Sequence, residues 1–348
     1  MPEARPVIDR ICNHFIRLKS MHSFNGNRFA QTAGCFAFFQ ADQGNGLPGA
    51  ASHIYQRHVP PKGTGLYTNR HVESAEGQPL VHENPLLVWL CHSATSTHCQ
   101  QCVKPLFDAV NAVSHPCRKP IFYCQHCKSV LYCSRECAQK AWRLYHHRQC
   151  KSSMVGLGLG RFEFDLRARF IFQAQAGRQS FTLNRFVNKD TFFSTLGSKE
   201  RICFALAAMI EAKMLHILGD EVLDDHSFLS TAMWLLKFKI VDNINSFVLE
   251  RTECDSTSGP KSQKLGHIIY LTTSMINHSC EPNCLIEFEN ARAVVRPKQD
   301  LKVGQELLIS YLPGNLLQNR PETRRLLKAI FYFDCQCGHC RSNDSEIN

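Results

Sequence analysis

The feature that most constrains the fold of this chain is a block of closely spaced cysteines and histidines between residues 99 and 150. Its pairs follow the spacings C-x2-C, C-x2-C, C-x3-C and H-x3-C, and each pair can give one metal ion two ligands from a single turn. The block has little aliphatic content, so bound metal must supply much of its folding free energy. We therefore expect two tetrahedral zinc sites built from Cys99, Cys102, Cys124, Cys127, Cys133, Cys137, His146 and Cys150.

Spacing alone leaves the assignment of these ligands open. The first and second pairs could share one ion, or the first and third pairs could share it in an interleaved arrangement. His147 also competes with His146, although only His146 gives the H-x3-C spacing. Cys117, which lies between the first two pairs, does not fit the ligand pattern.

A third cysteine cluster lies near the end of the sequence, in the stretch FDCQCGHC. It provides Cys335, Cys337 and Cys340, one ligand short of a closed structural zinc site. His339 could complete the set locally, but adjacent positions rarely converge on one ion. The sequence therefore favours a fourth ligand from a distant part of the chain.

Composition limits the compartment and the partners. The chain has 348 residues and 18 cysteines, and its first residues, MPEARPVIDRICNHF, contain no apolar signal segment. We therefore expect a protein of a reducing compartment, which is the cytoplasm, the nucleus or both. The sequence has no run of 18 or more apolar residues, so no membrane span is expected. The formal charge of +10 counts every thiol as neutral. Eleven thiolates on three zinc ions lower it to about +5, so direct nucleic-acid binding is not expected.

Hydrophobic periodicity divides the rest of the chain into strand-rich and helical segments. Short apolar runs broken by turn residues predict β-strands on both sides of the metal block and after Gly266. Helical spacing over Ile202–Leu218 and Phe228–Ile240 predicts helices, and another helix is expected to begin near Pro321. Residues 1–55 are expected to be loosely ordered, with one short helix near Ile8–Leu18. The segments that follow are expected to be strands in 56–98, the metal block in 99–150, helices in 151–262, strands in 263–312 and the last cysteine segment in 313–348.

Four motifs in order resemble the SET-and-MYND-domain (SMYD) family of protein-lysine methyltransferases. The metal block, with Tyr132 before Cys133 and Trp142 in the last spacer, is similar to a MYND zinc finger. The stretch NHSCEPN and the final C-x-C-x2-C are similar to the SET domain and its post-SET zinc site. The resemblance covers roughly residues 60 to 341, and its motifs are KGTGL at 62–66, the finger, NHSCEPNC at 277–284 and GQELLISY at 304–311.

The resemblance implies an α+β fold: a SET β-fold of short sheets with a pseudoknot, an inserted MYND finger, a helical insertion and a post-SET zinc. It implies interleaved ligands, with Cys280 completing the third zinc and Cys284 left as a packed spare. The chain ends eight residues after Cys340, so a short member without the family's helical C-terminal domain is expected. The implied sets are Cys99, Cys102, Cys133 and Cys137; Cys124, Cys127, His146 and Cys150; and Cys280, Cys335, Cys337 and Cys340.

The resemblance also implies S-adenosylmethionine as the cofactor. Asn277 suits the zwitterionic methionine end of this molecule, and the backbone near His278 suits the adenine edge. A turn with two glycines lets the backbone approach the cofactor closely. Asn188 is a further guess within the helical segment. The expected cofactor residues are Lys62, Gly63, Thr64, Gly65, Asn245, Asn277, His278, Tyr311 and Phe333.

Tyr311 is the implied catalytic residue, placed where the lysine channel meets the methyl donor. With an unperturbed pKa of about 10, it orients the substrate amine rather than acting as a strong base. Ile309 and Phe331 offer no hydroxyl near it, so restriction to monomethylation is not suggested.

The predicted function is methylation of a lysine in a histone or another protein, with a role in transcription regulation. The expected partners are that protein substrate and a peptide ligand of the finger, and the expected state is a monomer. The alternative is a MYND-mediated interaction protein, such as a corepressor, whose SET domain is weak or inactive. A DNA-binding zinc protein is disfavoured because no recognition helix lies between the ligands.

Overall fold

The computed structural model of the chain describes residues 47–60, 62–107, 121–147, 150, 196–218, 225–255, 259–289 and 291–341. The chain divides into two compact units, each made of segments far apart in the sequence. The first comprises Met1–Gln43, Leu87–Asn243 and Phe247–Ile268. The second comprises Gly44–Leu86, Ile244–Ser246 and Ile269–Asn348.

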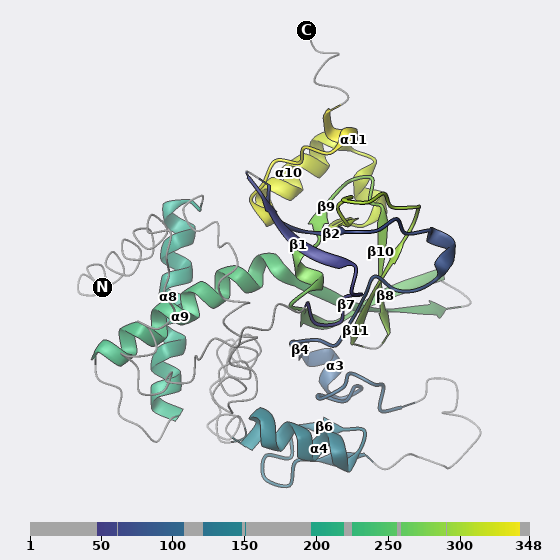
Figure 1. The fold of residues 1–348 in the computed structure, drawn as a ribbon. Coiled ribbons are helices and arrows are strands. Elements are labelled where there is room, and N and C mark those ends of the chain that lie inside the picture. Colours follow the sequence, from purple (N-terminus) through teal and green to yellow (C-terminus); the bar gives the residue numbers. More distant parts are fainter. Residues whose placement is uncertain are drawn as a thin grey trace. The chain divides into compact units, whose positions relative to one another are not determined.

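Small sheets build the second unit (Figure 1). Strands β1 (Ile54–Val59) and β2 (Gly63–Thr68) form an antiparallel pair. β10 (Cys284–Glu289) and β11 (Arg292–Pro297) form a hairpin in the segment after Gly266, where the sequence predicted strands. β3 (Val81–Glu83) pairs with the other edge of β11. Side chains of β10 alternate between more buried and exposed, the pattern of a strand with one covered face, whereas β11 buries three consecutive residues, Ala293–Val295.

A short parallel pair carries two of the predicted motifs. β9 (Asn277–His278) lies beside β12 (Leu308–Ile309), with Leu308 opposite Asn277 and Ile309 opposite His278. The strands therefore bring NHSCEPN next to GQELLISY, although about 30 residues separate them in the sequence.

Helix α10 (Arg320–Phe331) leads to the last cysteine cluster. It begins because the Asn319 side chain accepts a hydrogen bond from the Glu322 N–H and because proline is tolerated in the first turn. It ends at Tyr332, whose left-handed φ of 60° stops the helix. A short helix, α11 (Gly338–Arg341), follows.

The described part of the first unit contains a three-stranded sheet and two long helices. β4 (Leu87–Leu90), β8 (Gly259–Ile269) and β7 (Ser246–Asp255) are hydrogen-bonded in that order. Helices α8 (Ser198–Leu218) and α9 (Asp225–Asn245) cross in Figure 1. The buried ion pair between Lys239 and Glu211, with Nζ and Oε1 2.6 Å apart, joins these two helices.

The metal-binding block of the first unit has little regular structure. It contains α3 (His92–Thr95), the two-residue strands β5 (Phe122–Tyr123) and β6 (Leu131–Tyr132), α4 (Arg135–Ala141) and one π-helical turn, Trp142–His146. Its cluster of buried side chains is rich in cysteine. This agrees with the argument that apolar burial alone does not hold the block together.

The sequence predictions fare differently along the chain. The helices over Ile202–Leu218 and Phe228–Ile240 and the helix beginning near Pro321 are confirmed. The helical prediction for 151–262 is wrong at its end, because residues 246–255 and 259–262 belong to strands β7 and β8. The short helix near Ile8–Leu18, Cys117 and Asn188 lie outside the described residues. Among the described helices, none is long and apolar enough to cross a membrane.

Candidate functional site

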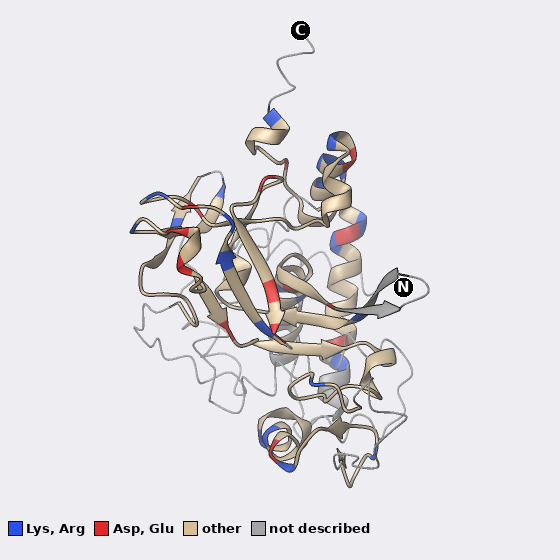
Figure 2. Cartoon of the chain, turned by 90° about the vertical axis from the view of Figure 1, so that its right-hand side faces the viewer, with Lys and Arg blue, Asp and Glu red and all other residues tan. Residues whose placement is uncertain are grey.

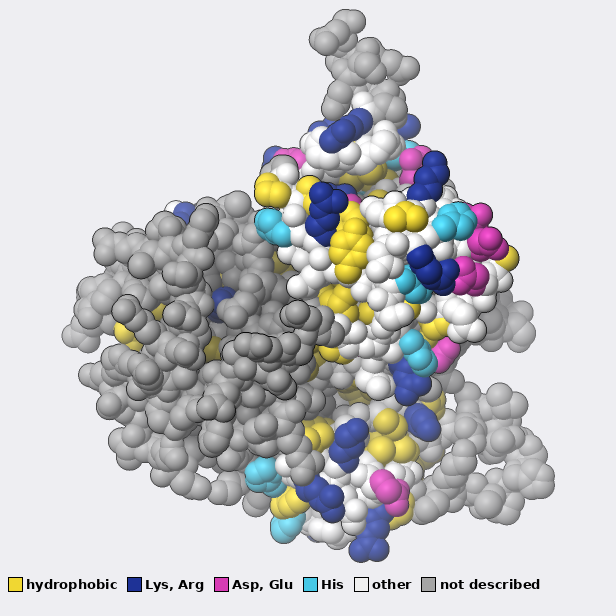
Figure 3. Space-filling view, in the orientation of Figure 1, with side chains coloured by type: hydrophobic (Ala, Val, Ile, Leu, Met, Phe, Trp, Pro, Cys, Tyr) yellow, Lys and Arg dark blue, Asp and Glu magenta, His cyan; other side chains and the backbone are white. Residues whose placement is uncertain are grey.

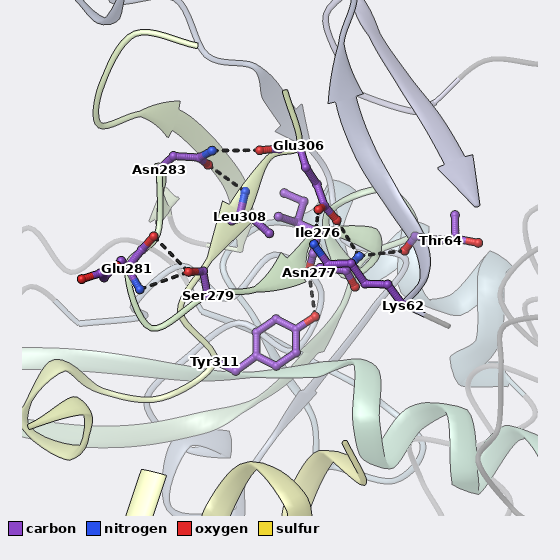
Figure 4. Close-up of polar contacts among 10 residues, drawn as sticks. All are labelled: Lys62, Thr64, Ile276, Asn277, Ser279, Glu281, Asn283, Glu306, Leu308 and Tyr311. Carbon is purple, nitrogen blue, oxygen red and sulfur yellow. Dashed lines mark hydrogen bonds and ion pairs between the residues drawn. The ribbon is translucent and has the colours of Figure 1, made fainter. Parts of the chain in front are cut away.

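A polar network in the second unit centres on the carboxylate of Glu306 (Figure 4). Lys62 Nζ forms an ion pair with this carboxylate. Asn277 Nδ2 donates to Glu306 Oε1 at 2.8 Å and to the Thr64 carbonyl at 3.4 Å. The Glu306 side chain is 11% exposed, so solvent screens its charge only partly. One carboxylate therefore holds two predicted cofactor residues, Lys62 and Asn277.

Two glycines at the start of β2 allow its backbone to approach this network. A Cβ on Gly65 would lie 2.5 Å from Glu306 Oε1 and 2.8 Å from Asn277 Nδ2, both too close for real atoms. Gly63 has a φ of +90°, which side chains other than glycine rarely adopt. The sequence predicted a backbone approach to a cofactor here, and the structure adds that Gly65 makes room for Glu306.

Asn283, the last residue of NHSCEPN, binds this motif to the segment that runs from Glu306 into β12. Its Nδ2 donates to the Glu306 carbonyl at 2.8 Å, and its Oδ1 accepts from the Leu308 N–H at 2.8 Å. Both ends of the amide are therefore used, and Asn283 is 4% exposed. The two motifs are held in register by this amide as well as by the β9–β12 pairing.

Tyr311 lies just beyond β12, against His278. Its hydroxyl donates to the Ile276 carbonyl at 2.7 Å, and its N–H donates to His278 Nδ1 at 3.0 Å. Burial, with a smaller effect of the Glu306 charge, raises the pKa of the Tyr311 phenol well above its usual range. The phenol therefore stays protonated, which agrees with an orienting role rather than that of a base.

Aromatic rings close the space around Tyr311. The ring centres of Phe331 and Phe333 lie 4.9 Å and 6.3 Å from that of Tyr311. The left-handed Tyr332 between them ends α10, so both phenylalanines can turn toward the same tyrosine. Phe333 also lies 6.1 Å from the His278 ring. Three rings and an imidazole thus form one apolar-walled site.

Four cysteines gather beside this site: Cys280, Cys335, Cys337 and Cys340. Cys280 Sγ lies 3.6 Å from Cys340 Sγ and 4.0 Å from Cys335 Sγ. Tetrahedral zinc, with Zn–S bonds of 2.3 Å, sets thiolates about 3.8 Å apart. Burial, together with the neighbouring thiols, raises the pKa of Cys335 to about 12, and a bound cation would favour its thiolate form. The set fits a structural zinc ion.

His278 connects this cysteine cluster to Tyr311. Its Nδ1 accepts the Tyr311 N–H, so the proton of the neutral ring is on Nε2, which lies 3.4 Å from Cys280 Sγ. Burial lowers the pKa of His278 to about 4, which keeps the ring neutral. A ligand cysteine thus receives a hydrogen bond from a residue of the site, the arrangement that orients ligands around a metal.

The metal block of the first unit forms two further ligand groups. One joins Cys99, Cys102, Cys133 and Cys137, and the other joins Cys124, Cys127, His146 and Cys150. Sulfur distances of 3.4 Å between Cys102 and Cys133 and 3.7 Å between Cys124 and Cys150 suit zinc. This is the interleaved arrangement. His147 is turned away, its Nδ1 2.7 Å from the Trp142 carbonyl.

Three further residues singled out in the sequence lie in different elements of the fold. Cys284 is 1% exposed and belongs to none of the metal-binding groups found among the described residues, as expected of a packed spare. Asn245 is the last residue of α9, and its part in cofactor binding stays a prediction. Ile309 is buried, two residues before Tyr311. Glu306 was missed, although an acidic residue inside the apolar run of GQELLISY is a signal that could have found it.

Comparison with known proteins decides the family. The SET domain matches residues 63–312, a range that contains the Glu306 network, the β9–β12 pair and Tyr311. The chain belongs to the SET-domain family. The two-strand junction of NHSCEPN and GQELLISY is therefore the junction of a SET domain, and the SET part of the resemblance drawn from its motifs is confirmed.

Curated relatives of this SET chain are SMYD proteins and a plant homologue. It is 26% identical to "Histone-lysine N-methyltransferase SMYD3" of Homo sapiens over 282 residues, 78% of this chain and 58% of the relative. It is 26% identical to "N-lysine methyltransferase SMYD2-B" of Danio rerio over 313 residues, 87% of this chain and 62% of the relative. "Histone-lysine N-methyltransferase ASHR1" of Arabidopsis thaliana is 25% identical over 81% of this chain and 54% of its own length. The chain spans less than two thirds of each.

Proposed function

We propose that this SET-family chain transfers a methyl group from S-adenosylmethionine to a lysine of a protein substrate. The observation that carries the proposal is the meeting of Asn277, His278 and Tyr311 around β9 and β12, beside the Glu306 network. Relatives named as histone-lysine or N-lysine methyltransferases support the same activity. The proposed substrate is a histone or another protein. A role in transcription regulation and a location in the cytoplasm, the nucleus or both are also part of the proposal.

The residues of the site fit the proposed cofactor. The methionine end of S-adenosylmethionine carries an ammonium and a carboxylate, and the site offers the Glu306 carboxylate, the Lys62 ammonium and the Asn277 amide. Phe333 and the backbone near His278 suit the adenine. When bound, the cofactor supplies an activated methyl group. Gly63, Thr64, Gly65, Asn245 and Tyr311 complete the proposed cofactor residues.

Tyr311 is the proposed catalytic residue. Its protonated hydroxyl, fixed on the Ile276 carbonyl, leaves the phenol oxygen free to accept a hydrogen bond from the substrate amine. The lysine must be neutral to accept a methyl group, and the rings of Tyr311, Phe331 and Phe333 lower its pKa by excluding water. Positioning and desolvation are thus the contributions of this chain.

Tyr311→Phe separates this activity from a site that only binds the cofactor. We expect turnover to fall by about 100-fold, because one positioned polar group is lost, while the Kd for S-adenosylmethionine changes by less than about threefold. The assay is transfer of labelled methyl from the zinc-loaded full chain to histones and to cell extract. Measurable cofactor binding without transfer by the wild-type chain would overturn the proposal in favour of an interaction protein.

Gly65→Ala tests the cofactor end of the site. The added methyl group would collide with Glu306 Oε1 and Asn277 Nδ2. We expect the Kd for S-adenosylmethionine to rise by at least about tenfold, a cost typical of overpacking. Gly314→Ala is the matched control, since its Cβ would meet no atom within 4 Å. Equal Kd values for both variants, measured by calorimetry, would place the cofactor elsewhere.

The finer architecture also belongs to the proposal. The three ligand groups hold three structural zinc ions, the metal block is a MYND finger inserted in the SET domain, and the segments around β9 and β12 thread as a pseudoknot. Lys and Arg are interspersed with Asp and Glu along the described ribbon (Figure 2), which favours a protein partner over nucleic acid. We propose a monomer.

Peptide docking by the finger is the second candidate function. Phe107, Tyr123 and Trp142 are 52%, 49% and 38% exposed there. Figure 3 shows hydrophobic side chains at this surface beside Lys and Arg side chains. Exposed aromatic side chains are typical of protein interfaces. This activity is compatible with methyl transfer, or it replaces transfer where the SET site is inactive.

A further inference from the structure

Glu83 is a buried carboxylate that the proposed mechanism does not use. It ends β3, opposite Ala293 of β11, and is 3% exposed. Among the described residues, no Lys, Arg or His nitrogen lies within 4.0 Å of its carboxylate. Burying a carboxylate without a cationic partner costs free energy, so other contacts must stabilise Glu83.

The carboxylate is held by one stretch of backbone, Leu271–Thr273. The Leu271 and Thr272 N–H groups each donate to Oε1 at 2.9 Å. The Thr273 N–H and hydroxyl each donate to Oε2 at 2.8 Å. Every contact comes from a donor, which is the arrangement that suits an ionised carboxylate. Burial raises the pKa of Glu83, and these hydrogen bonds oppose that rise.

A chain of hydrogen bonds runs from these donors to the candidate active site. The Thr273 carbonyl accepts the Ile276 N–H at 3.1 Å, through the 3-10 turn Thr273–Met275. The Ile276 carbonyl in turn accepts the Tyr311 hydroxyl at 2.7 Å. Asn277, which binds Glu306, is the next residue along the backbone. Three hydrogen bonds, through Thr273 and Ile276, thus connect Glu83 to the Tyr311 phenol.

We propose that Glu83 is a positioning residue for methyl transfer, which sets the places of the Ile276 carbonyl and Asn277 by holding the backbone of Leu271–Thr273. The inference rests on the proposed function and extends it to a residue outside the cofactor and substrate contacts. A carboxylate can accept all four donors at once, whereas an amide puts an NH2 group in place of one oxygen, and each oxygen here accepts two donors. Glutamine is therefore the sharpest probe, because it keeps the shape and removes the acceptor from two contacts.

Glu83→Gln is compared with Val294→Ala, a control in the same sheet. Val294 is 1% exposed on β11, so its truncation loosens the core without touching the Leu271–Thr273 contacts. At assay temperatures equally far below each variant's thermal midpoint, we expect Glu83→Gln to lower kcat by about tenfold and Val294→Ala to leave it unchanged. Equal kcat values for the two variants would reduce Glu83 to a structural residue.

A double-mutant cycle with Tyr311→Phe tests the route of the effect. If Glu83 acts through the Ile276 carbonyl, it has little left to position once the Tyr311 hydroxyl is gone. The loss in the double variant is then smaller than the product of the two single losses. Multiplicative losses would overturn the proposed route. Thr273→Val, which removes one donor and keeps the carboxylate, is measured in the same way and covers the case in which Glu83→Gln fails to fold.

Hydrogen exchange gives a readout that does not depend on turnover. We expect the Ile276 and Asn277 amides to exchange about tenfold faster in Glu83→Gln, but not in Val294→Ala. If the wild-type chain transfers no methyl group, the proposed function fails while this comparison still judges the positioning. Exchange that rises only at Leu271–Thr273 would overturn the inference about Glu83.

Discussion

Replacing Cys280 by alanine is expected to release one of the three proposed zinc ions and to reduce methyl transfer to background. Three thiolates cannot close a structural zinc site, and the ions that remain are those of the two groups in the metal block. The loss reaches the active site because His278 Nε2 lies 3.4 Å from Cys280 Sγ while His278 Nδ1 receives the Tyr311 N–H. Phe333, two residues before the ligand Cys335, loses its anchor as well.

Cys284→Ala is the matched control, because the same atom is removed four residues away. Cys284 is buried, and burial raises the pKa of its thiol to about 12, so the side chain packs as a neutral thiol. We expect a destabilisation of about 1 kcal/mol, three bound zinc ions and unchanged transfer. Metal analysis of both purified proteins, beside the transfer assay, makes the comparison. Three zinc ions in Cys280→Ala, or two in Cys284→Ala, would contradict the ligand set.

The zinc ligand sets are the part of the molecule that the sequence predicts best. Short spacings such as C-x2-C confine two ligands to one turn, so the pairs are local features that need no knowledge of the fold. Spacing could not decide between adjacent and interleaved partition, since the pairing of turns is a long-range property. That choice, and the distant ligand Cys280, came from the family resemblance, and the structure groups the same residues.

The residues that organise the site were harder to predict. Glu306 meets Lys62 across 244 positions, and Glu83 meets Thr272 and Thr273 across about 190. Such contacts follow from strand order and register, which local periodicity does not determine. The strand residues 246–255 and 259–262 were missed for a related reason. Polar residues interrupt their apolar ones, so local periodicity did not predict strands, and pairing with distant strands decided the structure.

The proposed functions make different demands on the metal block. Methyl transfer depends directly on the cysteine group of the second unit, because His278 connects Cys280 to Tyr311. Peptide docking depends on the metal block, whose exposed aromatic side chains lie beside its ligands. A variant that loses only zinc from the metal block therefore separates the two activities.

His146→Ala is that variant, and we expect it to unfold its half of the finger. The alanine leaves Cys124, Cys127 and Cys150 as three ligands. A structural zinc contributes on the order of 10 kcal/mol in isolated fingers, comparable to the whole stability of a small domain. Tyr132 and Trp142, whose rings pack at 6.3 Å and 5.9 Å from that of His146, lose this contact too. We expect bound zinc to fall from three ions to two, with rapid proteolysis between residues 121 and 150.

His147→Ala provides the control from the adjacent position. Its ring nitrogen contacts the Trp142 carbonyl at 2.7 Å and belongs to none of the ligand groups among the described residues. Losing this hydrogen bond costs about 1 kcal/mol and leaves three zinc ions. Zinc loss in His147→Ala but not in His146→Ala would exchange the two histidines. If His146→Ala also keeps methyl transfer, the zinc site of Cys124, Cys127, His146 and Cys150 is not needed for the chemistry.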